Sequence, residues 1–203
     1  MESPVAVGRG GLLWRAARTG GIGVVVLHPH PHMGGNMQNP LVEAILRELW
    51  KQERVSATLR FDFSHDLLQS EQEALAAAKL LRGHGVDTLA AVGYSYGAAI
   101  LMRLMTQKPC PFTAAALVAP PLDLLPTADP SALKPALDAG MSVALIAGTC
   151  DNVCSEQSLR ELHQKLSRTR LELLEGCDHF FGQDLAHAAS LAAQAISEPR
   201  ADL

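Results

Sequence analysis

The chain has 203 residues and a formal net charge of −4, and 48% of its residues are hydrophobic, 19% charged and 4% aromatic. These values are typical of a globular chain with room for one well-buried domain, and they exclude an intrinsically disordered protein. The sequence has no basic cluster and few aromatic rings, so it lacks the usual signals for binding nucleic acid or an anionic membrane surface.

Residues 22–27 form an apolar run that is too short to cross a bilayer, and residues 1–20 lack the three regions of a signal peptide. The four cysteines are Cys110, Cys150, Cys154 and Cys177. Their spacing matches no disulfide framework, which fits a reducing compartment. We therefore expect a soluble, cytoplasmic protein without a membrane span.

Strand-like and helix-like runs alternate along the chain. The predicted strands are 5–7 and 12–15, as an edge hairpin, then 23–27, 58–61, 88–94, 114–119, 143–147 and 171–174. The predicted helices run from an N-cap at Asn39 to Trp50, from a capping box of Ser70 and Glu73 to the glycines at 83 and 85, over 98–106, 131–138 and 155–166, and from about 183. This alternation predicts one α/β domain over residues 1–203, a mostly parallel twisted sheet between two layers of helices.

Residues 93–97 read Gly-Tyr-Ser-Tyr-Gly and lie between a predicted strand and a predicted helix. This is the context in which G-x-S-x-G forms a nucleophile elbow, a sharp turn that exposes a serine. The two glycines leave room for the strand and the helix to approach each other closely. The pattern makes Ser95 the candidate nucleophile, although the five residues alone also fit a small residue at a tight turn.

A serine hydroxyl needs a base to take its proton and a third group to orient that base. Asp151 and His179 each follow a predicted strand, and the order Ser, Asp, His is that of α/β-hydrolase triads. The carboxyl ends of parallel strands meet at one edge of a sheet, where such folds place their sites. Asp123, after an earlier strand, is the alternative acid, whereas Asp178 adjoins the base and is expected to cap its loop.

An oxyanion hole needs hydrogen-bond donors for the charge that develops on the carbonyl oxygen. The backbone N–H of Tyr96, directly after the candidate nucleophile, is the expected first donor. The loop after strand 23–27 is expected to supply the second. Because the prolines at 29 and 31 have no N–H, the N–H of His30 is the preferred donor, with His32 or Met33 as alternatives.

That loop reads His28-Pro29-His30-Pro31, followed by Gly34-Gly35-Asn36-Met37 and Asn39. It resembles the corresponding loop of small α/β-hydrolases without a substantial lid, of the dienelactone-hydrolase-like and predicted carboxylesterase type. The similarity continues through 93–97, 118–121, 151 and 176–181. The resemblance implies an α/β-hydrolase fold and an ester hydrolase with Ser95 as nucleophile, Asp151 as acid and His179 as base. It implies no cofactor.

One stretch departs from the pattern of these relatives, which commonly carry Arg-Gly-x-Gly-x-Ser after the strand that ends here at Phe61. In this chain residues 60–66 run almost directly into the next helix, so one wall of the pocket is predicted to be missing or rebuilt. The segment 120–140, where larger relatives insert a lid, has only about twenty residues. We expect an open, shallow site for a small-molecule substrate, a short acyl ester or thioester.

Other residues suggest other chemistry. The three histidines of the loop 28–32 invite a metal site, but alternating prolines favour an extended loop, so a structural role is expected. The cysteines at 150, 154 and 177 lie beside the candidate acid and base, where a zinc site or redox pair is the alternative to ordinary thiols. A serine peptidase or amidase would use the same triad, and a non-catalytic interaction module could occupy a hydrolase scaffold.

Overall fold

The computed structural model describes residues 1–64, 66–124, 129–166 and 168–198, and these form an eight-stranded sheet in the order β1-β2-β4-β3-β5-β6-β7-β8. The strands are β1 (Glu2–Val5), β2 (Gly11–Arg15), β3 (Ile22–Leu27), β4 (Val55–Phe61), β5 (Thr88–Tyr94), β6 (Ala114–Val118), β7 (Ser142–Gly148) and β8 (Thr169–Leu174). β1 and β2 form an antiparallel hairpin, β2 pairs antiparallel with β4, and every pairing from β4 to β8 is parallel. The prediction of a mostly parallel sheet is confirmed.

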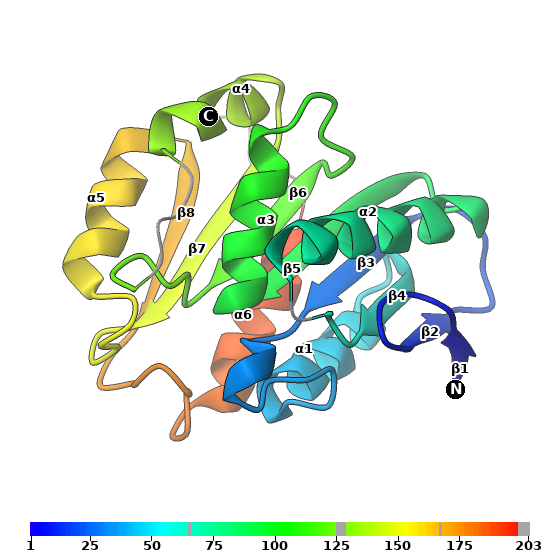
Figure 1. Cartoon of the computed structure of the whole chain (residues 1–203), viewed down its shortest axis with the longest axis horizontal. Coiled ribbons are helices and arrows are strands. Elements are labelled where there is room, and N and C mark those ends of the chain that lie inside the picture. The colour runs from blue at the N-terminus through cyan, green and yellow to red at the C-terminus, as the bar shows by residue number, and fades with distance from the viewer. Residues whose placement is uncertain (65, 125–128, 167, 199–203) are drawn as a thin grey trace.

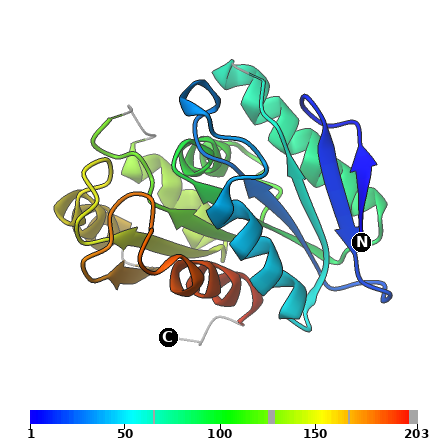
Figure 2. The same ribbon diagram turned by 90° about the horizontal axis from the view of Figure 1, so that it is seen from below.

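Helices cover both faces of this sheet. They are α1 (Pro40–Lys51), α2 (Leu67–Gly83), α3 (Tyr96–Thr106), α4 (Pro130–Asp138), α5 (Glu156–Leu166) and α6 (Leu185–Ser197), with a 3₁₀ turn, η1, at Pro31–Met33. α1 and α6 pack side by side on one face, and α2, α3, α4 and α5 cover the other (Figures 1 and 2). The three-layer architecture expected from the alternation of elements is therefore present.

The central strand β3 reads Ile-Gly-Val-Val-Val-Leu and is buried along its whole length. Alternate side chains of a strand point to opposite faces of the sheet. Val25 and Leu27 join the core beneath α2 to α5, whereas Val24 and Val26 join the core beneath α1 and α6. Each such side chain contributes about 1.5–3 kcal/mol of burial free energy, so this strand holds the two helical layers on the sheet.

The strand predicted over 5–7 is observed as β1 at Glu2–Val5. Its pairing with β2 ends where Val5 lies opposite Gly11. Val7, predicted to lie in the strand, is instead a buried loop residue that packs into the core under α2. Gly8, at φ 57°, turns the chain there. The apolar character of residue 7 reflects its burial in the core and not membership of a strand.

The capping box predicted at Ser70 and Glu73 is wrong. The helix α2 begins one turn earlier, with Asp66 as its N-cap, whose carboxylate accepts the N–H of Gln69 at 2.8 Å. Ser70 lies inside the helix and donates its hydroxyl to the Asp66 carbonyl, while the Glu73 carboxylate accepts the N–H of Ser64. The two polar side chains tie the end of β4 to the helix rather than starting the helix.

The expectation that no lid interrupts the segment 120–140 falls partly on residues 125–128, which lie outside the described residues. The described part of that segment contains α4, whose N-cap Asp129 accepts the N–H of Ser131. No helix in the described ranges is both long and apolar enough to cross a membrane.

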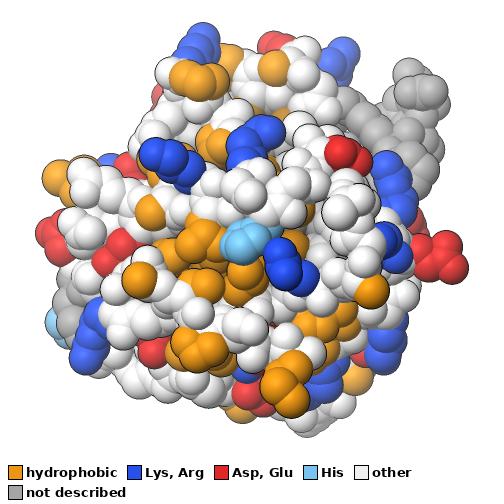
Figure 3. All heavy atoms as spheres, turned by 90° about the vertical axis from the view of Figure 1, so that its right-hand side faces the viewer, with side chains coloured by type: hydrophobic (Ala, Val, Ile, Leu, Met, Phe, Trp, Pro, Cys, Tyr) orange, Lys and Arg blue, Asp and Glu red, His pale blue; other side chains and the backbone are white. Residues whose placement is uncertain are grey.

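The two ends of the parallel sheet differ in charge. Loops that precede its strands, at the amino end, carry the cations Arg18, Arg54, Lys108 and Arg168 and the acidic residues Glu53 and Asp87. Figure 3 shows the face of the molecule at which α2 ends, with several Lys and Arg side chains around its centre. The loops that follow the strands lie at the opposite end, and these hold the candidate site.

Candidate active site

Ser95 lies at the turn between β5 and α3, with φ 52° and ψ −113°. A non-glycine residue at positive φ is strained and persists only where its surroundings hold it. A Cβ on Gly93 would lie 2.4 Å from the carbonyl oxygen of Gly97, and a Cβ on Gly97 would lie 2.3 Å from that of Leu27. The glycines therefore permit the close packing that holds Ser95 in its strained position.

The structure brings Ser95, His179 and Asp151 together. The Nε2 atom of His179 lies 3.0 Å from the Ser95 hydroxyl, and its Nδ1 atom lies 2.8 Å from the Asp151 carboxylate. A carboxylate only accepts hydrogen bonds, so Nδ1 carries the imidazole proton and Nε2 accepts the proton of Ser95. All three side chains are buried, which strengthens these interactions by keeping water away.

Asp151 is held by more than the histidine. Its second carboxylate oxygen accepts the backbone N–H groups of Val153 at 2.8 Å and Cys154 at 2.9 Å. These bonds satisfy a buried charge and aim the other oxygen at His179. The N–H groups at 153 and 154 were not expected from the sequence, because backbone orientation in a loop leaves no residue-type signal.

The rival acids lie elsewhere. The Asp123 carboxylate accepts the N–H of Ser155 at 2.6 Å and the hydroxyl of Ser158 at 2.5 Å. Burial acts to raise the pKa of Asp123, but these hydrogen bonds outweigh it and lower the pKa below its usual value. The Asp178 side chain accepts the N–H of Phe180 at 3.0 Å, which is a loop cap of the kind expected for it.

The loops after β7 and β8 are tied to each other, which fixes the acid relative to the base. Cys150 donates its N–H to the carbonyl of Cys177 at 2.9 Å, and Gly176 donates its N–H to the Thr149 hydroxyl at 2.9 Å. A Cβ on Gly148 would lie 2.1 Å from the Cys177 carbonyl oxygen, so only glycine fits at the end of β7.

The cysteines near the site are free thiols. Cys154 and Cys177 are buried, and burial raises the pKa of both thiols, which keeps them protonated. Cys150 is exposed. Within the described ranges no group of three or more His, Cys, Asp or Glu side chains is arranged to hold a metal ion.

Tyr94 is a residue of the site that the sequence did not single out. Its hydroxyl donates to the backbone carbonyl of His179 at 3.0 Å, and its ring lies 5.8 Å from the imidazole. Burial, followed by the charge of Asp151, raises the pKa of Tyr94, so the hydroxyl keeps its proton. The only available signal was its position beside the nucleophile, and that position fits packing equally well.

The loop after β3 brings His30 against the elbow. The imidazole of His30 lies 4.7 Å from the ring of Tyr96, and both residues line the pocket beside Ser95. Met33 donates its N–H to the His30 carbonyl at 3.0 Å, and the N–H of His32 lies 3.2 Å from the His30 ring. The alternative donors are thus turned towards their own loop. The N–H of Tyr96 belongs to the first turn of α3, where N–H groups have no partner within the helix.

His28 anchors the loop to the segment that follows β4. Its Nε2 atom accepts the N–H of Phe63 at 2.9 Å, so its Nδ1–H donates to the Pro29 carbonyl at 2.6 Å. Burial lowers the pKa of His28, and a proton on Nε2 would also meet the N–H of Phe63. Both ring nitrogens of His28 are therefore engaged by backbone groups, whereas the rings of His30 and His32 lie 5.6 Å from each other.

A pocket of about 470 Å³ opens beside the nucleophile. Its described lining residues are Pro29, His30, Met33, Gly34, Gly35, Asn39, Tyr94, Ser95, Tyr96, Pro121, Leu124, Val153, His179 and Phe180. The volume lies within the range of small-molecule sites. Met33, Leu124 and Phe180 are exposed at its walls, so the pocket offers apolar surface to a ligand.

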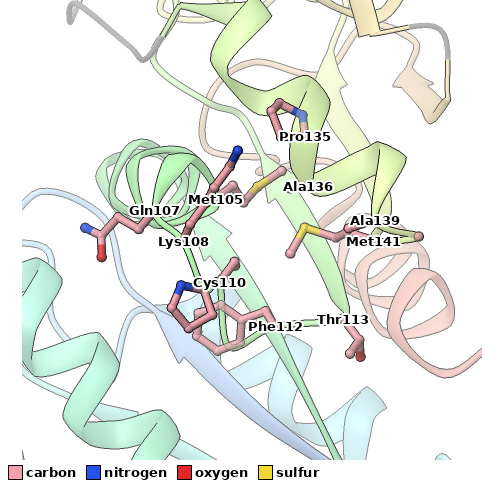
Figure 4. A pocket seen from close by; sticks show the side chains of 12 residues that line it. Met105, Gln107, Lys108, Cys110, Phe112, Thr113, Pro135, Ala136, Ala139 and Met141 are labelled. Carbon is pink, nitrogen blue, oxygen red and sulfur yellow. The ribbon is translucent and has the colours of Figure 1, made fainter.

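A second cavity, of about 540 Å³, lies where α3 ends and α4 passes the amino ends of β6 and β7 (Figure 4). Its walls include Met105, Phe112 and Met141, with Lys108 and Cys110 near one side. Burial raises the pKa of the Cys110 thiol, which disfavours the reactive thiolate. No serine, histidine or carboxylate is among its described lining residues, so this cavity lacks the serine and histidine that line the first pocket.

The residues 16–199 match the family model of the dienelactone hydrolase family. A search of curated proteins found no match. Among solved structures, an α/β hydrolase of unknown function from Agrobacterium tumefaciens is 22% identical, with 96% of this chain and 94% of that chain covered and a TM-score of 0.79. A Xanthomonas campestris protein described as an α/β serine hydrolase without a lid is 21% identical, with 96% and 93% covered and a TM-score of 0.75.

The dienelactone hydrolase from Anabaena variabilis is 20% identical, with 96% of this chain and 94% of that chain covered and a TM-score of 0.73. At this level of identity the structures establish the fold, and the predicted α/β-hydrolase fold is confirmed. The family match spans most of the sequence, from before β3 to the end of α6. The chain is therefore a hydrolase that belongs to the dienelactone hydrolase family.

Proposed function

We propose that this hydrolase cleaves short-chain acyl esters or thioesters through an acyl-enzyme intermediate on Ser95. The observation that carries the proposal is the position of the His179 ring, which lies 3.0 Å from the Ser95 hydroxyl and 2.8 Å from the Asp151 carboxylate. Distances of this size allow direct proton transfer from the nucleophile to the base. The strained backbone of Ser95 supports the same role.

In the first step the Ser95 oxygen attacks the substrate carbonyl carbon while its proton moves to Nε2 of His179. The imidazole becomes positively charged, and the buried Asp151 carboxylate stabilises that charge and keeps the ring oriented. When the tetrahedral intermediate collapses, the same proton passes to the leaving alcohol or thiol. The acyl group remains on Ser95.

In the second step water attacks the acyl-enzyme and gives a proton to Nε2 of His179. Collapse returns this proton to the Ser95 oxygen and releases the carboxylic acid. The balance is one ester and one water consumed, with one acid and one alcohol formed. Tyr94 helps by holding the backbone of His179 in place through both steps.

The oxyanion is assigned to the backbone N–H groups of Tyr96 and His30. Tyr96 begins α3, so the positive end of the helix dipole adds to its hydrogen bond. His30 lines the same pocket and packs against the ring of Tyr96. Loss of one oxyanion donor raises the barrier of such reactions by about 3–4 kcal/mol.

A fluorophosphonate probe tests the nucleophile. The wild-type protein should be labelled, Ser95→Ala should not, and Ser190→Ala on α6 should be labelled like the wild type. A folded wild-type protein that never labels would overturn the proposal. Esters of p-nitrophenol then test the substrate: butyrate should be cleaved faster than palmitate, and faster than the matched butyramide. Faster cleavage of the amide would indicate a peptidase or amidase.

A further inference from the structure

The loops around the candidate site carry charge of one sign. The segments that follow the parallel strands, 28–39, 62–66, 119–129, 149–155 and 175–184, contain neither Lys nor Arg. Their acidic residues are Asp62, Asp66, Asp123, Asp129, Asp151, Glu175, Asp178 and Asp184. Because these strands are parallel, the described parts of the segments lie at the same end of the sheet.

The pocket itself is uncharged apart from its histidines. No Lys, Arg, Asp or Glu is among its described lining residues. Met33, Leu124 and Phe180 line it with side chains that are 82%, 63% and 70% exposed. These side chains cover the walls with apolar surface, so a substrate would meet an apolar surface inside an acidic surround.

Positive charge that could offset this surround is scarce near this end of the described structure. Arg9 reaches this end from the turn before β2, where its N–H bonds to the Asp62 carbonyl at 2.9 Å, and it does not line the pocket. Arg60 donates to the Met37 carbonyl in the loop after β3 at 3.0 Å, and its guanidinium is paired with Glu2 at 2.6 Å. Arg160 on α5 is paired with Glu156 at 2.7 Å. Burial lowers the pKa of His28, so that ring is neutral at neutral pH.

We propose that the substrates of this site are uncharged esters with an apolar acyl or aryl group, and that esters carrying a carboxylate, sulfonate or phosphate are disfavoured. This inference rests on the proposed ester hydrolysis at Ser95. Acidic side chains around a pocket mouth create a negative potential, which lowers the local concentration and the encounter rate of anions. The described lining contains no Lys or Arg that could pair with an anionic group.

The test compares two esters of equal size that differ in charge, 4-(butyryloxy)benzenesulfonamide and 4-(butyryloxy)benzenesulfonate. At an ionic strength of about 0.01 M, where fields reach furthest, kcat/KM should be about tenfold higher for the neutral ester. At about 1 M salt the difference should fall to about threefold or less, because salt screens the field. An anionic ester cleaved as fast as the neutral one at low salt, with Ser95 labelled by the probe, overturns this inference alone.

Two double variants distinguish the effect of charge near the site from the effect of the protein's net charge. Glu175→Lys with Asp178→Asn raises the charge near the site, and the amide oxygen of the introduced asparagine can still accept the N–H of Phe180. Glu53→Lys with Asp138→Asn makes the same charge change at exposed positions at the amino end of the sheet. The first variant should reduce the disadvantage of the anionic ester about threefold, and the second should leave it unchanged. Equal effects of both variants would contradict a field localised at the site.

The same assay keeps this inference distinct from the function on which it rests. If neither ester is hydrolysed and the probe does not label Ser95, the proposed ester hydrolysis fails. If both are hydrolysed at equal rates while the probe labels, only the charge preference fails. A cationic analogue, 4-(trimethylammonio)phenyl butyrate, should be cleaved at least as efficiently as the neutral ester at low salt, and slower cleavage than that of the sulfonate would contradict the proposal.

Discussion

The hydroxyl of Tyr94 donates a hydrogen bond to the backbone carbonyl of His179 at 3.0 Å, although the two residues are 85 positions apart in the sequence. Tyr94 is the last residue of β5 and precedes the candidate nucleophile, so this bond joins the strand of the nucleophile directly to the loop of the base. Proton transfer requires the Ser95 hydroxyl and the His179 ring to stay at a fixed distance. The bond from Tyr94 to the His179 backbone holds the end of β5 and the loop of the base in that position.

Tyr94→Phe should therefore lower kcat/KM about tenfold, because a lost buried hydrogen bond costs about 0.5–1.5 kcal/mol and the His179 loop gains freedom. The control is Ser70→Ala, which removes the buried hydrogen bond that the Tyr96 hydroxyl donates to Ser70 at 3.2 Å, away from the triad. Both variants should lose similar thermal stability, but only the first should slow both ester hydrolysis and probe labelling. Equal loss of activity in both would show that the Tyr94 bond has no special role.

Substitution of the two candidate acids should have very different effects. In Asp151→Asn the amide oxygen can keep the N–H bonds of Val153 and Cys154, while the amide nitrogen faces His179 and favours the wrong imidazole tautomer. We expect kcat/KM to fall about 10⁴-fold, as in other triads. Asp123→Asn should change kcat/KM by less than about threefold, because the Asp123 carboxylate accepts its hydrogen bonds from Ser155 and Ser158, which lie outside the triad. Steady-state kinetics of both variants decide between the two acids.

Replacing glycine by alanine should destabilise the protein at the nucleophile elbow but not at an ordinary helix end. Gly97→Ala places a Cβ 2.3 Å from the Leu27 carbonyl oxygen, which only a backbone shift can relieve. We expect the free energy of unfolding to fall by about 3–5 kcal/mol or more. Gly83→Ala, at the end of α2 with nothing within 4 Å, should be neutral or slightly stabilising. Urea denaturation measures both, and a tolerated Gly97→Ala would contradict the close approach of β3 to α3.

The stability of the fold should decrease as the pH falls through the ordinary His pKa. Burial holds the pKa of His28 below the ordinary value of 6.5. Below pH 6.5 the unfolded chain therefore binds a proton at this position that the folded chain does not, and stability falls by up to about 1.4 kcal/mol per pH unit. The loss stops once the pH is below the lowered pKa of the folded state.

Urea denaturation at about pH 7.5 and about pH 5.5, on either side of the ordinary His pKa, measures this dependence. His28→Gln should remove the part of the stability loss that is due to His28. The glutamine oxygen can still accept the N–H of Phe63. An NMR titration of the wild-type His28 imidazole provides an independent measurement. A His28 pKa at or above that of a free imidazole would refute the assignment of a neutral, buried ring.

Much of the fold was predictable because each local pattern agreed with the global architecture. The β-branched run of β3 predicted a strand covered on both faces, and Asn39 with Pro40 predicted the start of α1. The bounds of β1 and the start of α2 are exceptions. For α2, Asp66 as well as Ser70 has a side chain that can cap a helix. The helix α2 begins after Asp66 because this start lets the side chains of Ser70 and Glu73 form hydrogen bonds with the segment that follows β4. Such a tertiary contact cannot be inferred from a local sequence pattern.

For the site, the sequence predicted the three side chains of the triad and the candidate oxyanion donors, but not the backbone groups that orient the triad. Ser95, Asp151 and His179 follow strands that end at one edge, so their meeting could be predicted from topology alone. The N–H groups that orient Asp151 and the Tyr94 bond to a carbonyl depend on loop dihedral angles, which the sequence does not reveal. The acidic surround comes from separate segments of the sequence, which only the fold brings to one end of the sheet.

The most direct test of the central claim is to trap the acyl group. The protein is mixed with p-nitrophenyl acetate, quenched in acid within the first turnover and digested for peptide mass spectrometry. An acyl-enzyme on Ser95 predicts an acetyl group on the peptide that contains this residue, absent from Ser95→Ala and accumulating more slowly in Asp151→Asn. Hydrolysis by the folded protein that persists in Ser95→Ala, or an acetyl group found only on another residue, would contradict it.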